Sequence, residues 1–576
     1  MMTHSNIIVL KFGSSVLRSE ADFASVVHEI YRHWREGMRV VAVVSALGNT
    51  TDRLLQQAKR ICTQPETAAS ATLLATGEAA SAALLSLALT RSGIPVRLLD
   101  AVQVGLRTTG GHMDATPISI DTARLLEATR CEVVVLPGFV GRGEDGDTTL
   151  LGRGGSDYSA LYLAQQLRAR CVLVKDIDGL YTSDPASTSI RPLRFIQASY
   201  DTALRVGGKI VQQKAVRFAA ANKFHFSITS IGSGRVTNIG SVPDQLDGSH
   251  YCSSPLRVAL LGCGTVGSGV YQRLAALPDL FTVTGVGVRK GDRARSTGVP
   301  EHLITPNLEA LLERPCDVVL ELIGGTTRAA SLIERALRLG RDVVSANKAL
   351  LSFKAEALER LAADCDAELR YSAAVGGSLP AIETIKRART NGRIIAFSAV
   401  LNGTCNFILD RLFAGASVTS AVRGAQDEGY AEADPTLDLS GIDAAQKLIL
   451  LVRAAFDVNL PLELVALEGI ERVDEERLND ARKLGKTLKL VAQCRRSGDD
   501  LEASVKPIEL PLSHPLALPR GVENRMIVEL ENGDRLIASG QGAGCWPTTE
   551  AVMADLFDIR RHRSVAQLSD LEERVA

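Results

Sequence analysis

The segment LRVALLGCGTVGSGV, residues 256–270, decides the fold of the second half of the chain. An apolar run that favours a strand leads into three glycines in the pattern GxGxxG, and a helix-favouring stretch follows. In this context the first glycine permits a tight turn, the second lets a pyrophosphate approach the backbone, and the third lets the helix pack closely. The helix N-terminus then attracts the phosphates. The segment predicts a Rossmann-type dinucleotide site whose loop comprises Gly262, Gly264, Thr265, Val266 and Gly267.

The next expected strand, TVTGVGV at 282–288, indicates which dinucleotide binds. It ends in Arg289 and Lys290. An acidic residue at this point would bind the ribose 2′-hydroxyl of NAD, whereas a basic pair suits the 2′-phosphate of NADP. The alternative is a solvated turn after a strand. The sequence therefore favours NADP, with NAD as the second possibility.

Strand-favouring and helix-favouring runs alternate along the whole chain. The β-branched runs include 40–46, 131–139 and 171–177, and the helical stretches include 79–90 and 158–168. This alternation indicates an α/β protein with parallel sheets covered by helices. Residues 241–255 have little apolar periodicity and end in proline, so we expect a linker there.

Length and composition exclude several classes of protein. A chain of 576 residues is too long for one core. The 65 basic and 66 acidic residues give a net charge of −1, so no nucleic-acid or membrane partner is expected. The ten cysteines form no CxxC pair and suggest reduced thiols. The apolar run at 79–90 is too short to span a bilayer and no secretory pattern is present, so we expect a cytoplasmic protein.

The stretch EGYAEADPTLDLSGIDAAQK, residues 428–447, gathers the ionisable side chains Glu432, Asp438, Asp443 and Lys447 in a turn-prone setting. Asp443 and Lys447 are four residues apart, so on a helix they share one face. The apolar run LILLV follows, which places the lysine at the mouth of a buried helix beside carboxylates. This arrangement suits proton transfer. The alternative is a solvated helix start with an ordinary ion pair.

The same stretch resembles the active-site signature of homoserine dehydrogenase, and the resemblance extends over 256–560. It implies that Glu432 and Asp438 bind the amino acid substrate. It also implies that Asp443 and Lys447 serve the reacting centre, where aspartate 4-semialdehyde and homoserine interconvert.

Three further segments carry this resemblance. In GRDVVSANKALLS (340–352) it implies that Lys348 contacts the reacting centre and the cofactor. DVVLELIGGTT (317–327) would lie near the nicotinamide, with Gly324 and Thr326 in contact. SGQGAGCWPTTEAV (539–552), which includes Gly544, would pack back against the cofactor domain.

The glycine-rich turn AAVGGSLPAI (373–382) resembles the family's monovalent-cation site. The resemblance implies that backbone carbonyls of Val375, Gly377 and Leu379 bind Na⁺ or K⁺. Many members carry an acidic residue where this chain has Ser372.

The first half shows two phosphate-binding signals. Lys11-Phe-Gly13-Ser14 follows the first expected strand, and TTLLGRGGSDYSA (148–160) places Arg153 before a glycine-rich helix start. Small-residue turns and helix N-termini bind phosphates through backbone N–H groups. With SALGNTTD (45–52) and KDIDGLYTSDP (175–185), these segments resemble aspartokinase, of the amino acid kinase type.

The resemblance implies a site for ATP, Mg²⁺ and aspartate. Lys11 would bind the transferring phosphate, and Asp157 would serve the phosphate or magnesium region. Thr50, Glu78 and Arg153 would bind aspartate. The full implied set is Lys11, Gly13, Ser14, Ser45, Thr50, Glu78, Arg153, Gly154, Gly155, Ser156, Asp157, Lys175, Asp176, Tyr181, Asp184 and Lys209.

The kinase half departs from the family pattern in places. Its turn after Lys11 is one residue shorter than Gly-Gly-Thr-Ser and is closer to that of glutamate 5-kinase. Gly-Glu-Arg becomes Gly77-Glu78-Ala79, and Lys-Val-Leu-His-Pro becomes Lys209-Ile-Val-Gln-Gln. Two alternatives therefore stay open: a non-catalytic kinase fold that acts as a scaffold, and a kinase for glutamate or another acyl acceptor.

These observations predict a bifunctional aspartokinase/homoserine dehydrogenase that forms a homodimer or homotetramer. The expected parts are an amino acid kinase-like α/β/α sandwich at 1–240, a linker at 241–255, a Rossmann domain at 256–385 completed by about 540–576, and an α+β substrate and dimerisation domain at 386–540. The linker is far shorter than a regulatory ACT domain, which aspartokinases usually carry. We therefore expect weak or no feedback inhibition by lysine or threonine.

Overall fold

The computed structural model describes residues 6–130, 132–184, 192–208, 210–247, 254–431, 434–498 and 500–575, with side chains up to 564. Lys209 and Glu432 of the predicted sites lie outside the described residues. The chain divides into two compact units. One comprises Met1–Arg91, Pro95–Cys252 and Arg561–Ala576, and the other Ser92–Ile94 and Ser253–Arg560. Both units mix helices with sheets, so the α/β prediction is confirmed.

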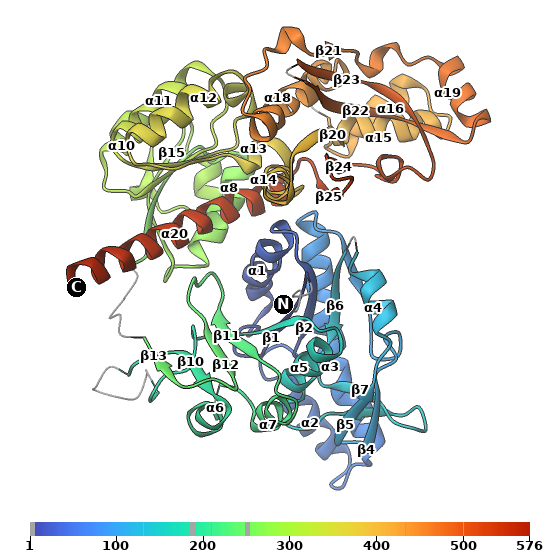
Figure 1. Ribbon diagram of the computed structural model, residues 1–576, viewed down its shortest axis with the longest axis vertical. Coiled ribbons are helices and arrows are strands. Elements are labelled where there is room, and N and C mark those ends of the chain that lie inside the picture. Colours follow the sequence, from blue (N-terminus) through green and yellow to red (C-terminus); the bar gives the residue numbers. More distant parts are fainter. Residues whose placement is uncertain are drawn as a thin grey trace. The chain divides into compact units, whose positions relative to one another are not determined.

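The first unit is built on a nine-stranded sheet in the order β13-β10-β12-β11-β9-β1-β2-β6-β3 (Figure 1). Its central strand β1 (Ile7–Phe12) is buried at every position because helices cover both faces. The other strands are β2 (Arg39–Val44), β3 (Val96–Leu98), β6 (Val133–Pro137), β9 (Arg170–Lys175), β10 (Phe195–Ser199), β11 (Phe226–Ser230), β12 (Thr237–Gly240) and β13 (Gln245–Leu246). β1 pairs in parallel with β2 and β9, so the carboxyl ends of these three strands meet at one edge.

Helices and a small sheet complete this unit. The helices are α1 (Phe23–Arg35), α2 (Thr50–Ile61), α3 (Thr67–Arg91), α4 (Thr122–Ala128), α5 (Gly155–Gln166), α6 (Tyr200–Val206) and α7 (Gln213–Ala221). The small sheet holds β4 (Arg107–Gly111), β5 (Asp114–Ser119), β7 (Val140–Arg142) and β8 (Thr148–Leu150). Helix α5 packs on β1, β2 and β9 and thereby brings its first turn to their carboxyl ends.

Helix α3 is longer than the apolar run at 79–90 indicated. Among the described residues it is the one helix long and apolar enough to cross a membrane, which is weak evidence because core helices pass the same test. Its buried residues recur every three or four positions, and it contacts α1, α2, β6 and β8. A single packed face of this kind is typical of a helix that covers a sheet.

The predicted linker begins later than expected. Gln245–Leu246 forms β13, which pairs antiparallel with β10. Asp244 accepts hydrogen bonds from Ser199 N–H and Thr202 Oγ1. Residues up to Asp247 therefore pack with the first unit. The strand was not predicted because it is short, has little apolar periodicity and is held by polar side chains.

The second unit contains a parallel Rossmann sheet in the order β16-β15-β14-β17-β18-β19. Its strands are β14 (Leu256–Leu261), β15 (Phe281–Gly287), β16 (Ile304–Thr305), β17 (Val318–Glu321), β18 (Asp342–Ser345) and β19 (Leu369–Arg370). Its helices are α8 (Thr265–Ala275), α9 (Asp292–Ser296), α10 (Leu308–Glu313), α11 (Thr327–Arg338) and α12 (Lys348–Asp364). Because β14 lies between β15 and β17, the strand order reverses at its carboxyl end, where such sheets bind ligands.

The last helix, α20 (Cys545–Val575), returns to this sheet. Its buried residues share a core with β14 and α8 (Figure 1). The rings of Phe281 and Phe557 meet edge to face with centroids 4.9 Å apart. A segment almost 300 residues downstream therefore covers one face of the Rossmann sheet.

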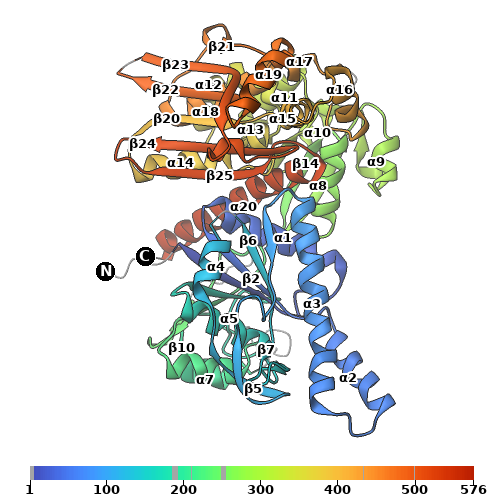
Figure 2. The same ribbon diagram turned by 90° about the vertical axis from the view of Figure 1, so that its right-hand side faces the viewer.

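A six-stranded sheet in the order β21-β23-β22-β20-β24-β25 forms the rest of the unit (Figure 2). Its strands are β20 (Ile394–Val400), β21 (Ala466–Leu467), β22 (Lys486–Ser497), β23 (Asp500–Pro511), β24 (Glu523–Leu530) and β25 (Arg535–Gln541). The accompanying helices are α13 (Ser372–Gly376), α14 (Ala381–Asn391), α15 (Gly403–Phe413), α16 (Val418–Asp427), α17 (Thr436–Leu439), α18 (Ile442–Phe456) and α19 (Glu475–Lys483). α18 contacts both β22 and α12, which links this sheet to the Rossmann helices.

Candidate functional site

Asp443 lies between two lysines in the second unit. It sits in the first turn of α18, after Gly441, whose φ of 83° needs glycine. Lys447 follows one turn later, with its Nζ 2.8 Å from Asp443 Oδ2. Lys348, the first residue of α12, places its Nζ 3.0 Å from Asp443 Oδ1. The structure thus brings the three predicted catalytic side chains together.

The two lysines differ in exposure. The Lys447 side chain is 7% exposed and also donates to the Leu401 carbonyl at 2.8 Å, so it is held from two sides. The Lys348 side chain is 40% exposed. Burial alone would raise the pKa of Asp443, but Lys447 and Lys348 outweigh it and hold that pKa well below its usual range. Asp443 is therefore an ionised carboxylate that balances the lysines.

Asp438 joins this cluster through Asn402. The Asn402 Nδ2 donates to Asp438 Oδ1 at 2.7 Å and to Asp443 Oδ2 at 2.9 Å. Burial raises the pKa of Asp438, the Asn402 hydrogen bond opposes this, and the negative charge of Asp443 adds to it. The sequence assigned no role in the site to Asn402.

A second network supports Lys348 from the Rossmann side. Asn347 caps α12 and donates to the Gly325 carbonyl at 2.7 Å. The buried Glu321 carboxylate accepts from Ser345 Oγ at 2.6 Å and from Gly324 N–H at 3.2 Å, and burial raises its pKa. The loop that holds Gly324 and Thr326 is thereby fixed beside the start of α12.

The glycine-rich turn fits a dinucleotide. Gly262 has a φ of 104°, and a Cβ there would lie 2.7 Å from the Leu322 carbonyl oxygen. A Cβ at Gly267 would lie 2.2 Å from the Gly262 oxygen. At Gly264 no described atom lies within 4 Å of such a Cβ. The turn is therefore closed toward the protein and open at Gly264, where α8 presents its N–H groups.

Basic side chains surround this turn. Arg289 and Lys290 follow β15 and are exposed. Arg293 Nη2 lies 3.2 Å from Thr265 Oγ1, a neighbour that the sequence did not indicate. On the opposite side Cys545 Sγ donates to the Thr265 carbonyl at 3.0 Å, which places Gly544 beside the turn.

The predicted cation segment is partly helical. Val375 lies in α13, Gly377 has a φ of 55°, and the Leu379 carbonyl accepts from Ala381 N–H at 2.8 Å. Ser372 Oγ donates to Glu383 Oε1 at 2.6 Å, so another helix supplies a carboxylate there. No group of three or more His, Cys, Asp or Glu among the described residues is arranged to hold a metal.

In the first unit, Asp157 also lies between two lysines. Its Oδ1 is 2.7 Å from Lys11 Nζ at the end of β1, and its Oδ2 is 3.0 Å from Lys175 Nζ at the end of β9. Burial opposes ionisation, but both lysines outweigh it and keep the pKa of Asp157 far below normal. Burial lowers the pKa of Lys175 to about 8. A Cβ at Gly13 would lie 2.7 Å from Lys11 Nζ, so glycine leaves room for that ammonium.

Glu78 faces the same strand ends from α3. Burial raises its pKa to about 7, against a backbone hydrogen bond from Ala46 and the charge of Lys11. Its Oε2 is buried with no hydrogen-bond partner among the described residues. Thr50 lies nearby, since a Cβ at Gly77 would be 3.3 Å from its Cγ2.

The other predicted kinase residues lie around these strand ends. Gly154 has a φ of 77° and precedes α5, whose first residues Gly155 and Ser156 are buried. Ser45 follows β2, and Ser14 and Arg153 are exposed. Asp176 follows β9 and Asp184 is exposed. The Tyr181 hydroxyl donates to Asp178 at 2.6 Å.

Comparison with known proteins identifies both units. The homoserine dehydrogenase family model matches residues 380–557, and the homoserine dehydrogenase NAD binding domain matches 262–372. Homoserine dehydrogenase of Mycobacterium tuberculosis is 37% identical over 337 residues, covering 56% of this chain and 76% of the relative. The chain belongs to the homoserine dehydrogenase family.

Homoserine dehydrogenase of Bacillus subtilis is 34% identical over 317 residues, covering 53% of this chain and 73% of the relative. The crystal structure of a homoserine dehydrogenase from Thiobacillus denitrificans matches with a TM-score of 0.50 and 34% identity, covering 54% of this chain and 74% of that one. The amino acid kinase family model matches residues 6–230. A homoserine dehydrogenase with a nicotinamide-binding domain is confirmed, and the added kinase domain supports a bifunctional enzyme of the aspartate pathway.

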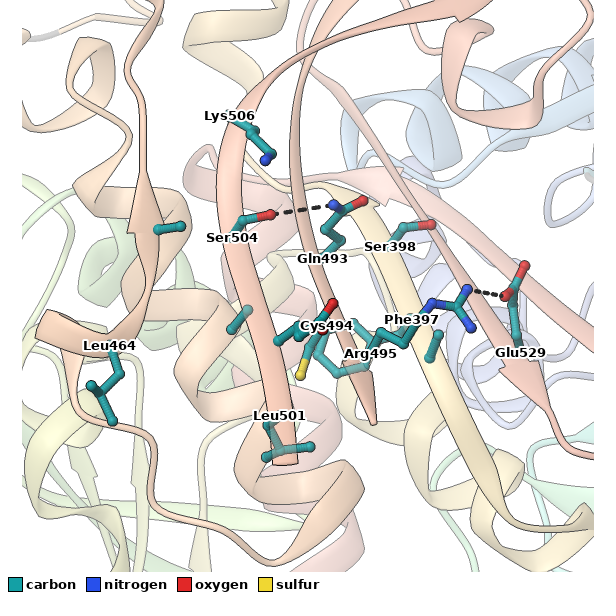
Figure 3. A pocket seen from close by; sticks show the side chains of 14 residues that line it. Phe397, Ser398, Leu464, Gln493, Cys494, Arg495, Leu501, Ser504, Lys506 and Glu529 are labelled. Carbon is teal, nitrogen blue, oxygen red and sulfur yellow. Dashed lines mark hydrogen bonds and ion pairs between the residues drawn. The ribbon is translucent and has the colours of Figure 1, made fainter. Parts of the chain in front are cut away.

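One hollow of the homoserine dehydrogenase unit lies apart from the catalytic cluster. A hollow of about 490 Å³ lies over β20, β22 and β23 (Figure 3). Gln493 Nε2 donates to Ser504 Oγ at 3.3 Å, and Arg495 pairs with Glu529 at 3.2 Å. None of the predicted site residues lines it.

Proposed function

We propose that the homoserine dehydrogenase unit reduces aspartate 4-semialdehyde through the pair Lys348 and Lys447, with Asp443 as their common anchor. The observation that carries this proposal is the Asp443 carboxylate 3.0 Å from one ammonium and 2.8 Å from the other. The nicotinamide, when bound, supplies the hydride. The aldehyde oxygen then gains negative charge. A nearby ammonium stabilises this charge and donates a proton to the oxygen.

Lys447 is the better candidate for the proton donor. An ammonium has three N–H donors, and Asp443 and the Leu401 carbonyl take two of them. One donor remains for the substrate oxygen. Lys348 is more exposed and starts α12 beside the Gly324–Thr326 loop. It would contact the substrate on the side that faces the cofactor. Asp438, with Glu432, would bind the substrate ammonium.

NADP is the proposed cofactor. The exposed Arg289 and Lys290 follow β15, and Arg293 lies against Thr265 of the glycine-rich turn. Three cations at this corner suit a 2′-phosphate, which NAD lacks. Na⁺ or K⁺ at the carbonyls of Val375, Gly377 and Leu379 remains part of the proposal.

The kinase unit is proposed to phosphorylate aspartate from ATP and Mg²⁺, giving 4-aspartyl phosphate. Lys11 and Lys175, both buried and anchored on Asp157, would neutralise the transferring phosphoryl group. Glu78, whose Oε2 has no hydrogen-bond partner in the part of the chain that the structure describes, would take the substrate ammonium, and Thr50 and Arg153 would complete the acceptor site. Buried charges are costly to keep, so this cluster favours a catalytic unit over a scaffold.

One preparation tests both halves. Homoserine-dependent NADP reduction and aspartate-dependent ADP release should both be measurable on the purified chain. ADP release with glutamate but not aspartate would support the alternative acceptor, and no release with either would support a scaffold.

The remaining proposals concern the setting of the enzyme. A cytoplasmic location fits the eight described cysteines, none of which forms a disulfide bond. A homodimer or homotetramer is expected from the family, and light scattering on the purified chain would measure it.

A further inference from the structure

The side chain of Asn402 makes three hydrogen bonds inside the dehydrogenase site. Its Nδ2 donates to Asp438 Oδ1 at 2.7 Å and to Asp443 Oδ2 at 2.9 Å. Its Oδ1 accepts from Cys405 N–H at 2.7 Å. Asn402 itself is 3% exposed. The reversed amide would set an oxygen against two carboxylates, so these partners define its orientation.

The amide joins two carboxylates with different tasks. Asp443 balances Lys348 and Lys447, whereas Asp438 meets no lysine at ion-pair distance among the described contacts. Without a donor between them, the two carboxylates would repel each other in a buried setting. Asn402 satisfies both without adding charge. It therefore fixes the distance between the lysine pair and the carboxylate that faces the substrate.

The same residue also anchors the backbone on which Asp438 depends. Asn402 Oδ1 caps α15, and Cys405 Sγ in the first turn of that helix donates to the Asp438 carbonyl at 3.0 Å. Two hydrogen bonds, one to the side chain and one to the backbone carbonyl of Asp438, thus hold α17 against the start of α15.

We infer that Asn402 is a positioning residue for the dehydrogenase reaction: its amide sets the substrate-binding carboxylate of Asp438 in register with the Asp443-anchored lysines. This inference rests on the proposed role of Asp438. A residue with this function controls how well the amino group of homoserine and its reacting alcohol carbon are placed at the same time.

The test separates the amide from the helix cap. Asn402→Ser keeps an oxygen that can cap α15 but removes both N–H donors, since serine is a good N-cap. Asn307→Ser is the matched control, because Asn307 caps α10 through Ala310 N–H at 2.9 Å, away from the site. We expect N307S to unfold near the temperature of the unaltered protein, and N402S to unfold at a lower temperature but stay folded in the assay, because Asp438 and Asp443 lose their shared donor. N402S should raise the KM for homoserine at least tenfold and leave the KM for NADP within twofold.

The pH profile supplies a second readout. The Asn402 hydrogen bond lowers the pKa of Asp438, so its loss should move the acid limb of kcat/KM for homoserine to higher pH. A purely structural role would not move this limb.

Asp438→Asn distinguishes the inference from the function on which it rests. If D438N raises the KM for homoserine while N402S behaves like N307S in both KM and pH profile, the positioning role is overturned and the proposed site stands. If D438N and N402S both leave the KM for homoserine unchanged, the proposed role of Asp438 and the positioning role of Asn402 are both overturned.

Discussion

Lys348 Nζ lies 3.0 Å from Asp443 Oδ1, and Lys447 Nζ lies 2.8 Å from Oδ2 of the same carboxylate. The two lysines come from different helices almost a hundred residues apart, and each takes its own oxygen. One carboxylate therefore fixes the separation of two ammonium groups. This arrangement places two positive charges at the carboxyl end of the Rossmann sheet, where the nicotinamide of such folds lies.

Lys447→Ala should lower the turnover of homoserine oxidation by about a thousandfold, because it removes the proposed proton donor. The KM for NADP should change little. Steady-state kinetics with both substrates varied would measure this. Lys483→Ala, at an exposed lysine of α19, serves as the control. Turnover within tenfold of the unaltered enzyme would exclude Lys447 from catalysis.

Asp443→Asn should lower both turnover and stability at neutral pH. The variant leaves two ammonium groups without their carboxylate, and breaking a buried ion pair costs about 3 kcal/mol or more. The folded pKa of Asp443 is depressed, so its contribution is present above the unfolded pKa of about 4 and is lost as the pH falls below it. Urea midpoints of the two proteins should therefore differ by a constant amount from pH 7 to about pH 5 and should converge as the pH falls below about 4. A difference that stays constant on further acidification would contradict the ion-pair account.

Glu78 should give the kinase a pH-dependent affinity for aspartate. Its pKa is raised to about 7, so below that pH the carboxyl is protonated and the substrate ammonium loses its partner. The KM for aspartate should rise as the pH falls from 8 to 6 in initial-rate assays. Glu78→Gln should have a high KM that does not vary over this range.

The ionisation of Glu78 should favour aspartate binding but lower the stability of the fold. An acid with a raised folded pKa stabilises the fold when protonated, and this contribution is lost as the pH rises from about 4 through 7. Glu78→Gln should therefore unfold at a higher temperature than the unaltered protein at pH 8, and the gap should close at pH 5. Equal melting temperatures at pH 8 would mean that the burial of this carboxylate is not costly.

Gly264→Ala and Gly267→Ala form a matched pair at the cofactor turn. A Cβ at Gly264 meets no described atom within 4 Å, so the variant should fold normally and yet bind the nucleotide more weakly, by about tenfold or more, because the methyl group occupies the pyrophosphate space. A Cβ at Gly267 would lie 2.2 Å from the Gly262 oxygen, so that variant should be less stable. Thermal unfolding with and without NADP would resolve the two effects. Normal nucleotide affinity in G264A would place the pyrophosphate elsewhere.

Arg289→Ala should raise the KM for NADP about tenfold or more, because a cation on the 2′-phosphate is removed. The KM for NAD should stay within twofold, which makes NAD the internal control. Arg293→Ala tests in the same way whether the side chain against Thr265 shares this task. Equal effects on both nucleotides would indicate that these arginines contact the pyrophosphate, which NAD and NADP have in common.

Local signals in the sequence were sufficient for the elements and for several site residues. The apolar run and glycines at 256–270 produced β14, the turn and α8 as predicted. The spacing of Asp443 and Lys447 correctly placed both on one helix face. These features depend on neighbours within a turn or two, so local pattern determines them.

Other contacts needed the folded chain. Asn402 and Arg293 carried no recognisable signal, because their partners lie 36, 41 and 28 residues away. The strand at 245–246 was missed because its pairing partner β10 begins 50 residues earlier. Lys175 could be placed beside Asp157 only by the parallel pairing of β1 with β9 and the packing of α5.

The sequence by itself determined where most of the strands, helices and glycine turns form and which chemistry each half carries, since those depend on residue type and short-range order. The tertiary structure alone decided that one carboxylate in each unit is shared by two lysines. Charges from distant segments meet only when sheets and helices pack, and burial then sets which of them stay ionised.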